Sequence, residues 1–380
     1  MKQASSRSIA FQRLLSFSFF LVMNFTGWIG PASLLYGAET SPSWQLEWQK
    51  TLEAARKEGQ VVVYGPAGTD ARKALAEAFQ QKYGITVEYL GSRGTERIVK
   101  MKAERDAGQY TVDIHIGGLT TPLVSLKPIG ALDPISSALI LPEIKEPKNW
   151  QEGKLPWFDK EQNFLPALYR GRTSVIVNTN IVKPGEIKSY KDFLNAKWKD
   201  NIILDDPRGT GPGQQLFTFF LLHRDLGPAF VRALAIQGLF VTDNRTIQRD
   251  SLAHGKKAIL LGGAESVMET AIEKGLPVAH LTTKDFKEGG QLAFGGSVLE
   301  LINKAPHPNA AKVYINWFFS REGQTVIARE LGFASRRADV PTDHLKPWQL
   351  ARPEDYMIDS EEANNAKDNV VKFAKELFGF

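Results

Sequence analysis

Apolar positions in the first third of the chain occur either in short continuous runs or at helical spacing. In the segment 43–60, Leu46, Leu52 and Ala55 lie near helical spacing, which predicts a helix. The same patterns predict, in order, a buried strand 61–64, a helix through Ala74 and Phe79, a strand 85–91, a helix 95–108 and a strand 112–118. Strands that alternate with helices predict a parallel sheet with helices on both faces.

This alternation is interrupted between residues 119 and 164, where six prolines separate short apolar pieces. A strong strand is expected at 169–182, and a second series then follows: strand 201–206, helix 214–222, strand 258–263, helix 266–274 and strand 277–282. The series predicts a second parallel sheet. An apolar segment 294–303, an amphipathic segment 309–331 and a charged helical tail complete the pattern.

The first 38 residues have the pattern of an export signal. Lys2, Arg7 and Arg13 accompany an apolar run over 14–23, which is too short to span a bilayer comfortably. We expect cleavage after Ala38, and an uncleaved membrane anchor is the alternative.

Charge and cysteine content narrow the class of protein. The formal charge of +5 and the pI of about 9.1 at first favour a polyanion partner such as nucleic acid. Three of these charges lie in the N-terminal segment and no acidic residue precedes Glu39, so the remainder carries only +2 and no nucleic-acid partner is expected. The absence of cysteine excludes disulfides, thiolate metal sites and a lipid-bearing cysteine. An exported, untethered protein is expected in the periplasm.

Four segments are the most specific in the chain. They are "VIVNTNIVKPGE" (175–186), "SYKDFLNAKWKDNIILDDPRGTG" (189–211), "SLAHGKKAILLGG" (251–263) and "APHPNAAKVYINWFFSREGQ" (305–324). Together they resemble extracellular solute-binding proteins of ABC importers, in the ferric-iron-type branch with the type 2 periplasmic-binding fold. The similarity extends from Gln45 to about Pro341.

The resemblance implies an α/β fold of two lobes, each a mostly parallel sheet flanked by helices, joined by crossing strands. Lobe 1 would comprise residues 44–170 and 292–335, lobe 2 would comprise 175–290, and the tail 336–380 would pack on lobe 2. The strand 174–178 would carry the chain across. The resemblance also implies a small-molecule ligand between the lobes, an ABC permease in the inner membrane as partner, and a monomeric receptor.

Five loops follow predicted strands and contain glycine beside hydroxyl or amide side chains. They are 65–70, 91–95, 117–121, 206–214 and 262–266. In parallel sheets, ligands bind beyond the carboxyl ends of the strands, where helix N-termini offer backbone N–H groups. Any one loop alone is also compatible with an ordinary strand-to-helix turn.

Arginines in or beside turns suit a carboxylate or a phosphate. Arg93 and Arg208 are the main candidates, whereas Arg170, Arg172 and Arg336 are secondary ones. Each is also able to pair with a neighbouring acid such as Asp205 or Glu96. The predicted ligand-binding residues are Gly68, Thr69, Ser92, Arg93, Gly94, Gly118, Thr120, Tyr169, Arg208, Gly209, Thr210, Gly211, Glu265 and Ser266.

Metal and cofactor motifs are missing from the sequence. Many ferric members of the branch hold iron with adjacent tyrosines after the strand that matches "AILLGG", but here "GGAESVMET" follows, and the nearest candidate ligand is Glu265. The six histidines show no metal-binding spacing. We predict no metal site and no cofactor, and an iron or iron-chelate receptor of the same class remains an alternative.

Catalytic motifs are also missing, because "GTGPGQQ" lacks the lysine and hydroxyl of a nucleotide-binding loop. Asp205 and Asp206 are expected to point to opposite faces and to serve as capping and turn residues. We therefore predict a periplasmic receptor, not an enzyme, that captures a small oxygen-rich anion. An exported hydrolase or transferase using Glu265 and a cleft arginine is the alternative from another class. Phosphonate, phosphate ester, carboxylate, iron chelate and polyamine all remain open as ligands.

Overall fold

The structure is a computed structural model. It describes residues 43–92, 94–172, 175–209, 211–263, 268, 271–283, 286–346 and 349–379. The expected export signal and part of the expected helix 266–274 lie outside these residues.

The first sheet has the strand order β2-β1-β3-β12-β4. Its strands are β1 (Gln60–Pro66), β2 (Thr86–Ser92), β3 (Ile114–Gly117), β4 (Leu132–Asp133) and β12 (Val298–Ile302). β1 pairs in parallel with β2 and β3, whereas β12 runs antiparallel to β3 and β4. The sheet is therefore mixed but mostly parallel, as expected: four of its five strands run in one direction, and β12, which enters from the second half of the chain, runs in the opposite one.

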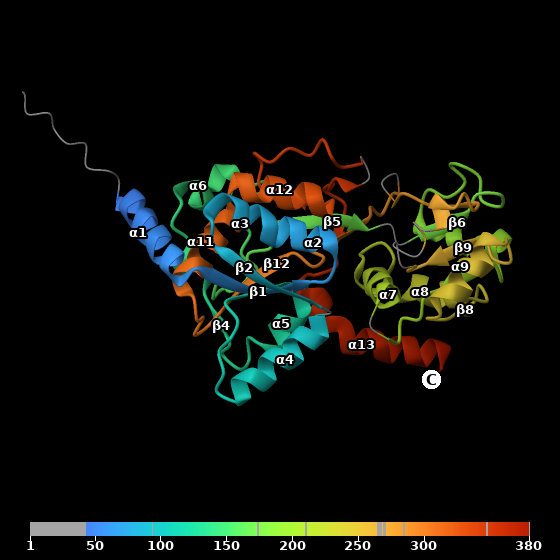
Figure 1. The fold of residues 1–380 in the computed structure, drawn as a ribbon. Helices are drawn as coiled ribbons and strands as arrows, with labels where there is room; N and C mark the ends of the chain where they lie inside the picture. The colour runs from blue at the N-terminus through green and yellow to red at the C-terminus, as the bar shows by residue number, and fades with distance from the viewer. Residues whose placement is uncertain are drawn as a thin grey trace, which may run out of the picture. The chain divides into compact units, whose positions relative to one another are not determined.

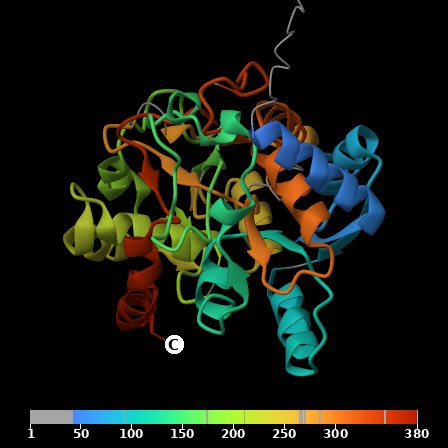
Figure 2. The same cartoon turned by 90° about the vertical axis from the view of Figure 1, so that its left-hand side faces the viewer.

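Helices cover both faces of this sheet. They are α1 (Ser43–Glu58), α2 (Thr69–Arg72), a π-helical turn (Lys73–Glu77), α3 (Ala78–Tyr83), α4 (Gly94–Asp106), α5 (Thr120–Ser125), α6 (Pro142–Lys145), α11 (Pro308–Phe319) and α12 (Arg321–Leu331), with 3-10 turns at Ile135–Ala138 and Pro147–Asn149. Figures 1 and 2 both show α1 beside α11. Alternate residues of β1 face opposite cores: Val61 and Val63 join one apolar cluster, and Tyr64 joins the other.

The second sheet has the order β10-β6-β9-β7-β8 and is also mixed. Its strands are β6 (Val175–Asn178), β7 (Ile202–Leu204), β8 (Phe240–Val241), β9 (Ile259–Leu261) and β10 (Val278–His280). Its helices are α7 (Pro212–Leu222), α8 (Gly227–Ala235) and α9 (Arg245–Ala253), with 3-10 turns at Tyr190–Leu194 and Ala196–Trp198. Phe217, Phe219 and Phe220 of α7 are fully buried in the larger of its two cores.

A small third sheet, of order β13-β5-β11-β14, links the two halves of the chain. Its strands are β5 (Leu168–Arg172), β11 (Gln291–Ala293), β13 (Ala334–Ser335) and β14 (Tyr356–Met357). β5 and β11 are antiparallel, with Arg172 opposite Gln291. The single strand expected at 169–182 is thus two strands, β5 in this sheet and β6 in the second sheet.

The C-terminal helix α13 (Glu361–Phe378) packs against α7 and α8 (Figure 1). Ser360 begins the helix by accepting a hydrogen bond from the Ala363 N–H. Val370 and Ala374 are buried in the larger core of the second sheet. The tail beyond residue 360 is therefore an integral part of the packed structure.

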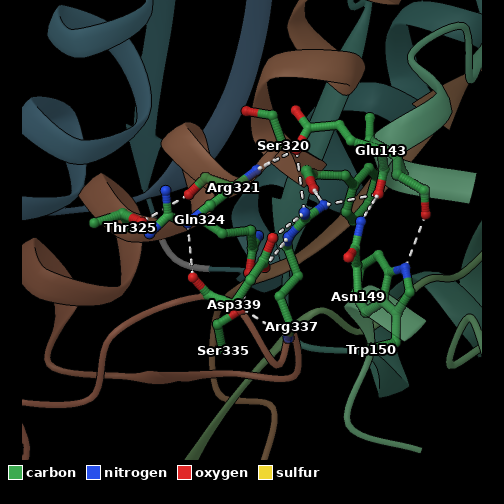
Figure 3. Close-up of polar contacts among 12 residues, drawn as sticks. Glu143, Asn149, Trp150, Ser320, Arg321, Gln324, Thr325, Ser335, Arg337 and Asp339 are labelled. Carbon is green, nitrogen blue, oxygen red and sulfur yellow. Dashed lines mark hydrogen bonds and ion pairs between the residues drawn. The ribbon is translucent and has the colours of Figure 1, made fainter. Parts of the chain in front are cut away.

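Arg337 is a buried structural arginine (Figure 3). Its guanidinium forms two hydrogen bonds of 2.8 Å to the Asp339 carboxylate and one of 3.0 Å to the Phe319 carbonyl. It also lies 3.1 Å from the Glu143 carboxylate. These contacts fasten the segment after β13 to α6 and α11. Its neighbour Arg336, a secondary ligand candidate, instead pairs with Glu152 at 2.6 Å.

Among the described helices, none combines the length and the apolar character that a bilayer crossing requires.

Candidate ligand-binding site

A cavity of about 370 Å³ is lined by residues of the loop after β3, α5, the third sheet, α7 and α13, and we call it the α7 cavity. It lies within the size range of small-molecule sites. Its lining is mostly hydroxyl, amide and charged: Gly118, Leu119, Thr120, Thr121, Arg172, Gly211, Gln214, Gln215, Thr218, Ala293, Gly295, Ile358, Asp359 and Lys367.

The N-terminus of α7 forms one wall of this cavity. Gly211 precedes the helix and Pro212 occupies its first turn, where a missing N–H costs nothing. Gly213 donates its N–H to Asp205 Oδ2 at 2.8 Å. A Cβ at Gly213 would lie 2.2 Å from the Asp205 carbonyl oxygen, so only glycine allows this close approach. The positive end of the helix dipole is thereby held at the cavity.

Asp205 is a structural carboxylate and not a ligand candidate. Besides Gly213, it accepts a 2.6 Å hydrogen bond from Gln248 Nε2. Burial raises the pKa of Asp205, and these two hydrogen bonds oppose that effect. Asp205 therefore fixes the first turn of α7 against α9.

Arg172 provides the first cation. It ends strand β5, and its Nη1 donates to Gln215 Oε1 on α7 at 3.2 Å. A guanidinium presents five N–H donors, so one arginine is able to engage several acceptors at once.

Asp359 is the only carboxylate among the described residues of the cavity wall. Its Oδ2 accepts the backbone N–H of Phe294 at 2.8 Å, which engages it with the segment after β11. Burial raises the pKa of Asp359, while Lys367 and Arg172 partly oppose this rise. The two cations and one engaged carboxylate among the described wall residues sum to a net positive charge, which suits an anionic ligand.

Lys367 provides the second cation, from α13. Its Nζ donates to Thr120 Oγ1 at 2.9 Å and to Asn364 Oδ1 at 2.7 Å. Thr120 in turn donates to Asn364 Oδ1 at 2.7 Å. This triad joins the C-terminal helix to the beginning of α5.

Arg97 binds the backbone at the ends of three strands of the first sheet. Its Nη1 donates to the Gly65 carbonyl at 2.6 Å and to the Ser92 carbonyl, and its Nη2 donates to the Ile116 carbonyl at 3.2 Å. These three carbonyls lie at the carboxyl ends of β1, β2 and β3. Arg97 therefore sets the positions of the loops that follow all three parallel strands.

Arg97 also contacts a buried pair of ionisable side chains, His115 and Glu300. Arg97 Nε lies 3.3 Å from His115 Nε2, and His115 Nδ1 lies 2.6 Å from Glu300 Oε2. Because an arginine nitrogen only donates, His115 Nε2 accepts and Nδ1 carries the proton that is donated to Glu300. Burial lowers the pKa of His115 to about 3 and raises that of Glu300 well above its usual range. His115, as expected, belongs to the interior of the sheet.

Arg208 lies at a different cavity, of about 430 Å³, together with Gly209. Its Nε and Nη2 bind both carboxylate oxygens of Asp206, at 2.8 and 2.6 Å, and its Nη1 donates to the Gly379 carbonyl at 2.9 Å. The pKa of Asp206 is lowered by its hydrogen bonds to Arg208. Arg208 therefore pairs with its neighbour Asp206, which is the alternative given above for such arginines. It does not line the α7 cavity.

The other predicted site residues divide into three groups. Gly118, Thr120 and Gly211 line the α7 cavity. Gly68, Thr69, Ser92, Gly94 and Tyr169 lie elsewhere, at the start of α2, the end of β2, the start of α4 and in β5. Arg93, Thr210, Glu265 and Ser266 lie outside the described residues.

Three contributors to the cavity are poorly predicted by the sequence. Arg172 is only a secondary candidate there, and Asp359 and Lys367 are not candidates because the tail is expected only to pack on lobe 2. The sequence does contain a signal for this wall of the cavity, because Gln214 and Gln215 at the start of α7 directly follow the glycine-rich loop.

A model of the bacterial extracellular solute-binding protein family matches residues 74–352. Solved structures give a consistent picture of the fold. A Trichodesmium protein (IdiA, FutA) in complex with iron and citrate is 20% identical, with a TM-score of 0.62, over 85% of this chain and 100% of that chain. AfuA from Actinobacillus pleuropneumoniae, with fructose-6-phosphate bound, is 20% identical, with a TM-score of 0.57, over 84% of this chain and 98% of that chain.

A putative extracellular solute-binding protein from Bordetella parapertussis is 14% identical, with a TM-score of 0.65, over 85% of this chain and 99% of that chain. At these identities the three structures show the fold, and the family model shows the membership. The family and the two-lobed α/β fold predicted from the sequence are thereby confirmed. The chain belongs to the family of bacterial extracellular solute-binding proteins.

Proposed function

We propose that this protein is the receptor of an ABC importer and captures a small, oxygen-rich anionic solute in the α7 cavity. One observation carries the proposal: Arg172, Lys367 and the N-terminus of α7 converge on a cavity whose single described carboxylate, Asp359, is already bonded to a backbone amide. An anion would complete the charge of this site.

The polar lining specifies the rest of the solute. Thr120, Thr121, Gln214 and Gln215 offer hydroxyl and amide groups that suit the oxygens of a polyol or a carboxylate. Citrate and fructose 6-phosphate, which occur in the structures of two similar proteins, both combine negative charge with hydroxyl groups. We assign the ligand of this chain to the same chemical class, hydroxycarboxylates or sugar phosphates.

Bare ferric iron fits the described wall of the cavity poorly as cargo. The wall contains two cations and one carboxylate, and among its described residues there is no tyrosine or histidine. Within the described chain, no group of three or more His, Cys, Asp or Glu side chains is placed to hold a metal ion. Iron would accordingly enter this cavity as an anionic chelate.

The proposal is of binding without turnover. Members of the family are binding proteins, and Asp205 and Asp206 are each engaged by neighbouring groups. Incubation with fructose 6-phosphate or citrate should return the compound unchanged by NMR spectroscopy. Product formation would favour an exported hydrolase or transferase instead.

Export and assembly follow from the same role. We propose that residues 1–38 direct the chain to the periplasm and are removed, and that a monomeric receptor delivers the solute to a permease in the inner membrane. The family's extracellular character supports this location. Mass spectrometry of the periplasmic fraction should find a chain that begins near Glu39.

Substitution of Arg172 tests the ligand site. Calorimetric titrations with citrate and fructose 6-phosphate should show that Arg172→Met weakens binding about 10- to 100-fold, the range for one charge-assisted hydrogen bond of about 1.5–3 kcal/mol. Arg56→Met, an exposed position on α1, is the matched control and should bind as the wild type does. Wild-type affinity in Arg172→Met would contradict the proposed site.

A further inference from the structure

Lys367 occupies an unusual place on α13. The helix buries Ala363, Val370 and Ala374 along one stripe, and Lys367 lies one turn from both Ala363 and Val370 on that stripe. Its side chain is therefore directed toward the packed side of the helix, where it is half-buried. The exposed Lys372, on the same helix, shows the ordinary alternative for a lysine.

Within the part of the chain that the structure describes, the ammonium group of Lys367 contacts only neutral partners. Two of its three N–H groups are used, by Thr120 Oγ1 and Asn364 Oδ1. Among the described residues no carboxylate lies within ion-pair distance of its Nζ. A half-buried cation without a contacting counter-charge is costly unless a negative group joins it.

The nearby carboxylate does not fill this role. Asp359 influences Lys367 only at longer range, and its Oδ2 is engaged by the Phe294 N–H. Both Asp359 and Lys367 line the α7 cavity. A ligand in the cavity is therefore able to accept a hydrogen bond from the remaining N–H of Lys367. Burial lowers the pKa of Lys367, which is the expected response of an ammonium with no counter-ion in contact.

Lys367 also lies outside the segment that the family model matches, which ends at residue 352. The contacts to Thr120 therefore bring a residue from beyond the matched segment to the beginning of α5, a helix inside it. The cation itself therefore lies outside the segment that the family model matches.

We infer that Lys367 is a specificity-determining residue that recognises a second negative charge on the solute, with Asn364 and Thr120 as positioning residues. Arg172 and the α7 N-terminus would hold one negative charge, and Lys367 would distinguish a dianion from a monoanion. This inference rests on the proposed function of the α7 cavity.

Two esters of similar shape and different charge provide the test. Fructose 6-phosphate is a dianion at pH 8, and fructose 6-sulfate is a monoanion. By calorimetry the wild type should prefer the phosphate by about tenfold or more, and Lys367→Met should weaken phosphate binding about 10- to 100-fold while changing sulfate binding less than about twofold. Lys367→Arg should retain the preference, and Lys372→Met should bind both esters as the wild type does. Thermal unfolding of each variant confirms that it is folded.

The outcomes separate this inference from the proposed function. If Arg172→Met weakens the binding of both esters and Lys367→Met keeps the preference for the phosphate, the proposed cavity is supported and the role of Lys367 is overturned. If neither substitution changes either affinity, both the cavity and the role of Lys367 are overturned. A wild type that binds neither ester also overturns the inference, and titration with citrate then decides whether the cavity binds anions.

Discussion

At the scale of single residues, the first lobe depends on a buried row of three ionisable side chains. Arg97, His115 and Glu300 are each almost fully buried, and their hydrogen bonds leave Glu300 Oε1 without a partner among the described residues. The pKa of His115 is lowered and that of Glu300 is raised, so the two groups respond to pH in opposite directions. Burial thus favours the neutral form of both side chains in the folded protein.

Glu300→Gln should make the stability of the protein depend on pH in a new way. His115 alone then has a folded pKa near 3 against 6.5 when unfolded, so the unfolded state binds more protons between these values. The free energy of unfolding should rise with pH by up to about 1.4 kcal/mol per pH unit in that window, and the gain is complete above a pH of about 6.5. Urea titrations at several pH values measure this slope. Above pH 4.5 the wild type should show a smaller slope, because Glu300 binds more protons in the folded state there, and equal slopes in the two proteins above pH 4.5 would contradict the opposed titrations.

At the scale of elements, α7 belongs both to the core of the second lobe and to the wall of the α7 cavity. Its apolar face is buried in the second core, its first turn is fixed by Asp205, and its N-terminus forms a wall of the α7 cavity. α13 packs against the same helix and reaches α5 through Lys367. Anything that displaces the first turn of α7 should therefore alter solute binding.

Gly213→Ala tests this dependence. The added methyl group would lie 2.2 Å from the Asp205 carbonyl oxygen, so the first turn of α7 has to move. We expect a loss of about 1–3 kcal/mol in the free energy of unfolding, as for overpacked cores, together with weaker binding of citrate and fructose 6-phosphate. Gly209→Ala is the control, since no atom lies within 4 Å of the place its methyl group would take and its φ lies outside the left-handed region. Denaturant unfolding and calorimetry of both variants check the result, which fails if the two variants behave alike.

At the scale of the whole molecule, the hydrophobic pattern predicted the architecture well and the ligand wall poorly. Alternation of apolar runs and helical spacing located the strands of both large sheets, apart from the two-residue strands β4 and β8, because burial on a sheet face is a local, periodic property. The antiparallel placement of β12 and the division of 169–182 into β5 and β6 depend on long-range pairing, which local spacing does not encode. The same holds for charge. Arg208 and Arg172 both lie near turns, and only the fold shows that Arg208 pairs with Asp206 and that Arg172 lines the cavity.

The position of the bound solute is best measured in a crystal structure of the protein with fructose 6-phosphate. We predict that the phosphate group lies in the α7 cavity, within hydrogen-bond distance of Arg172 and the first turn of α7. Density for the ligand beside Arg208, or at any site that leaves the α7 cavity without it, would contradict the account.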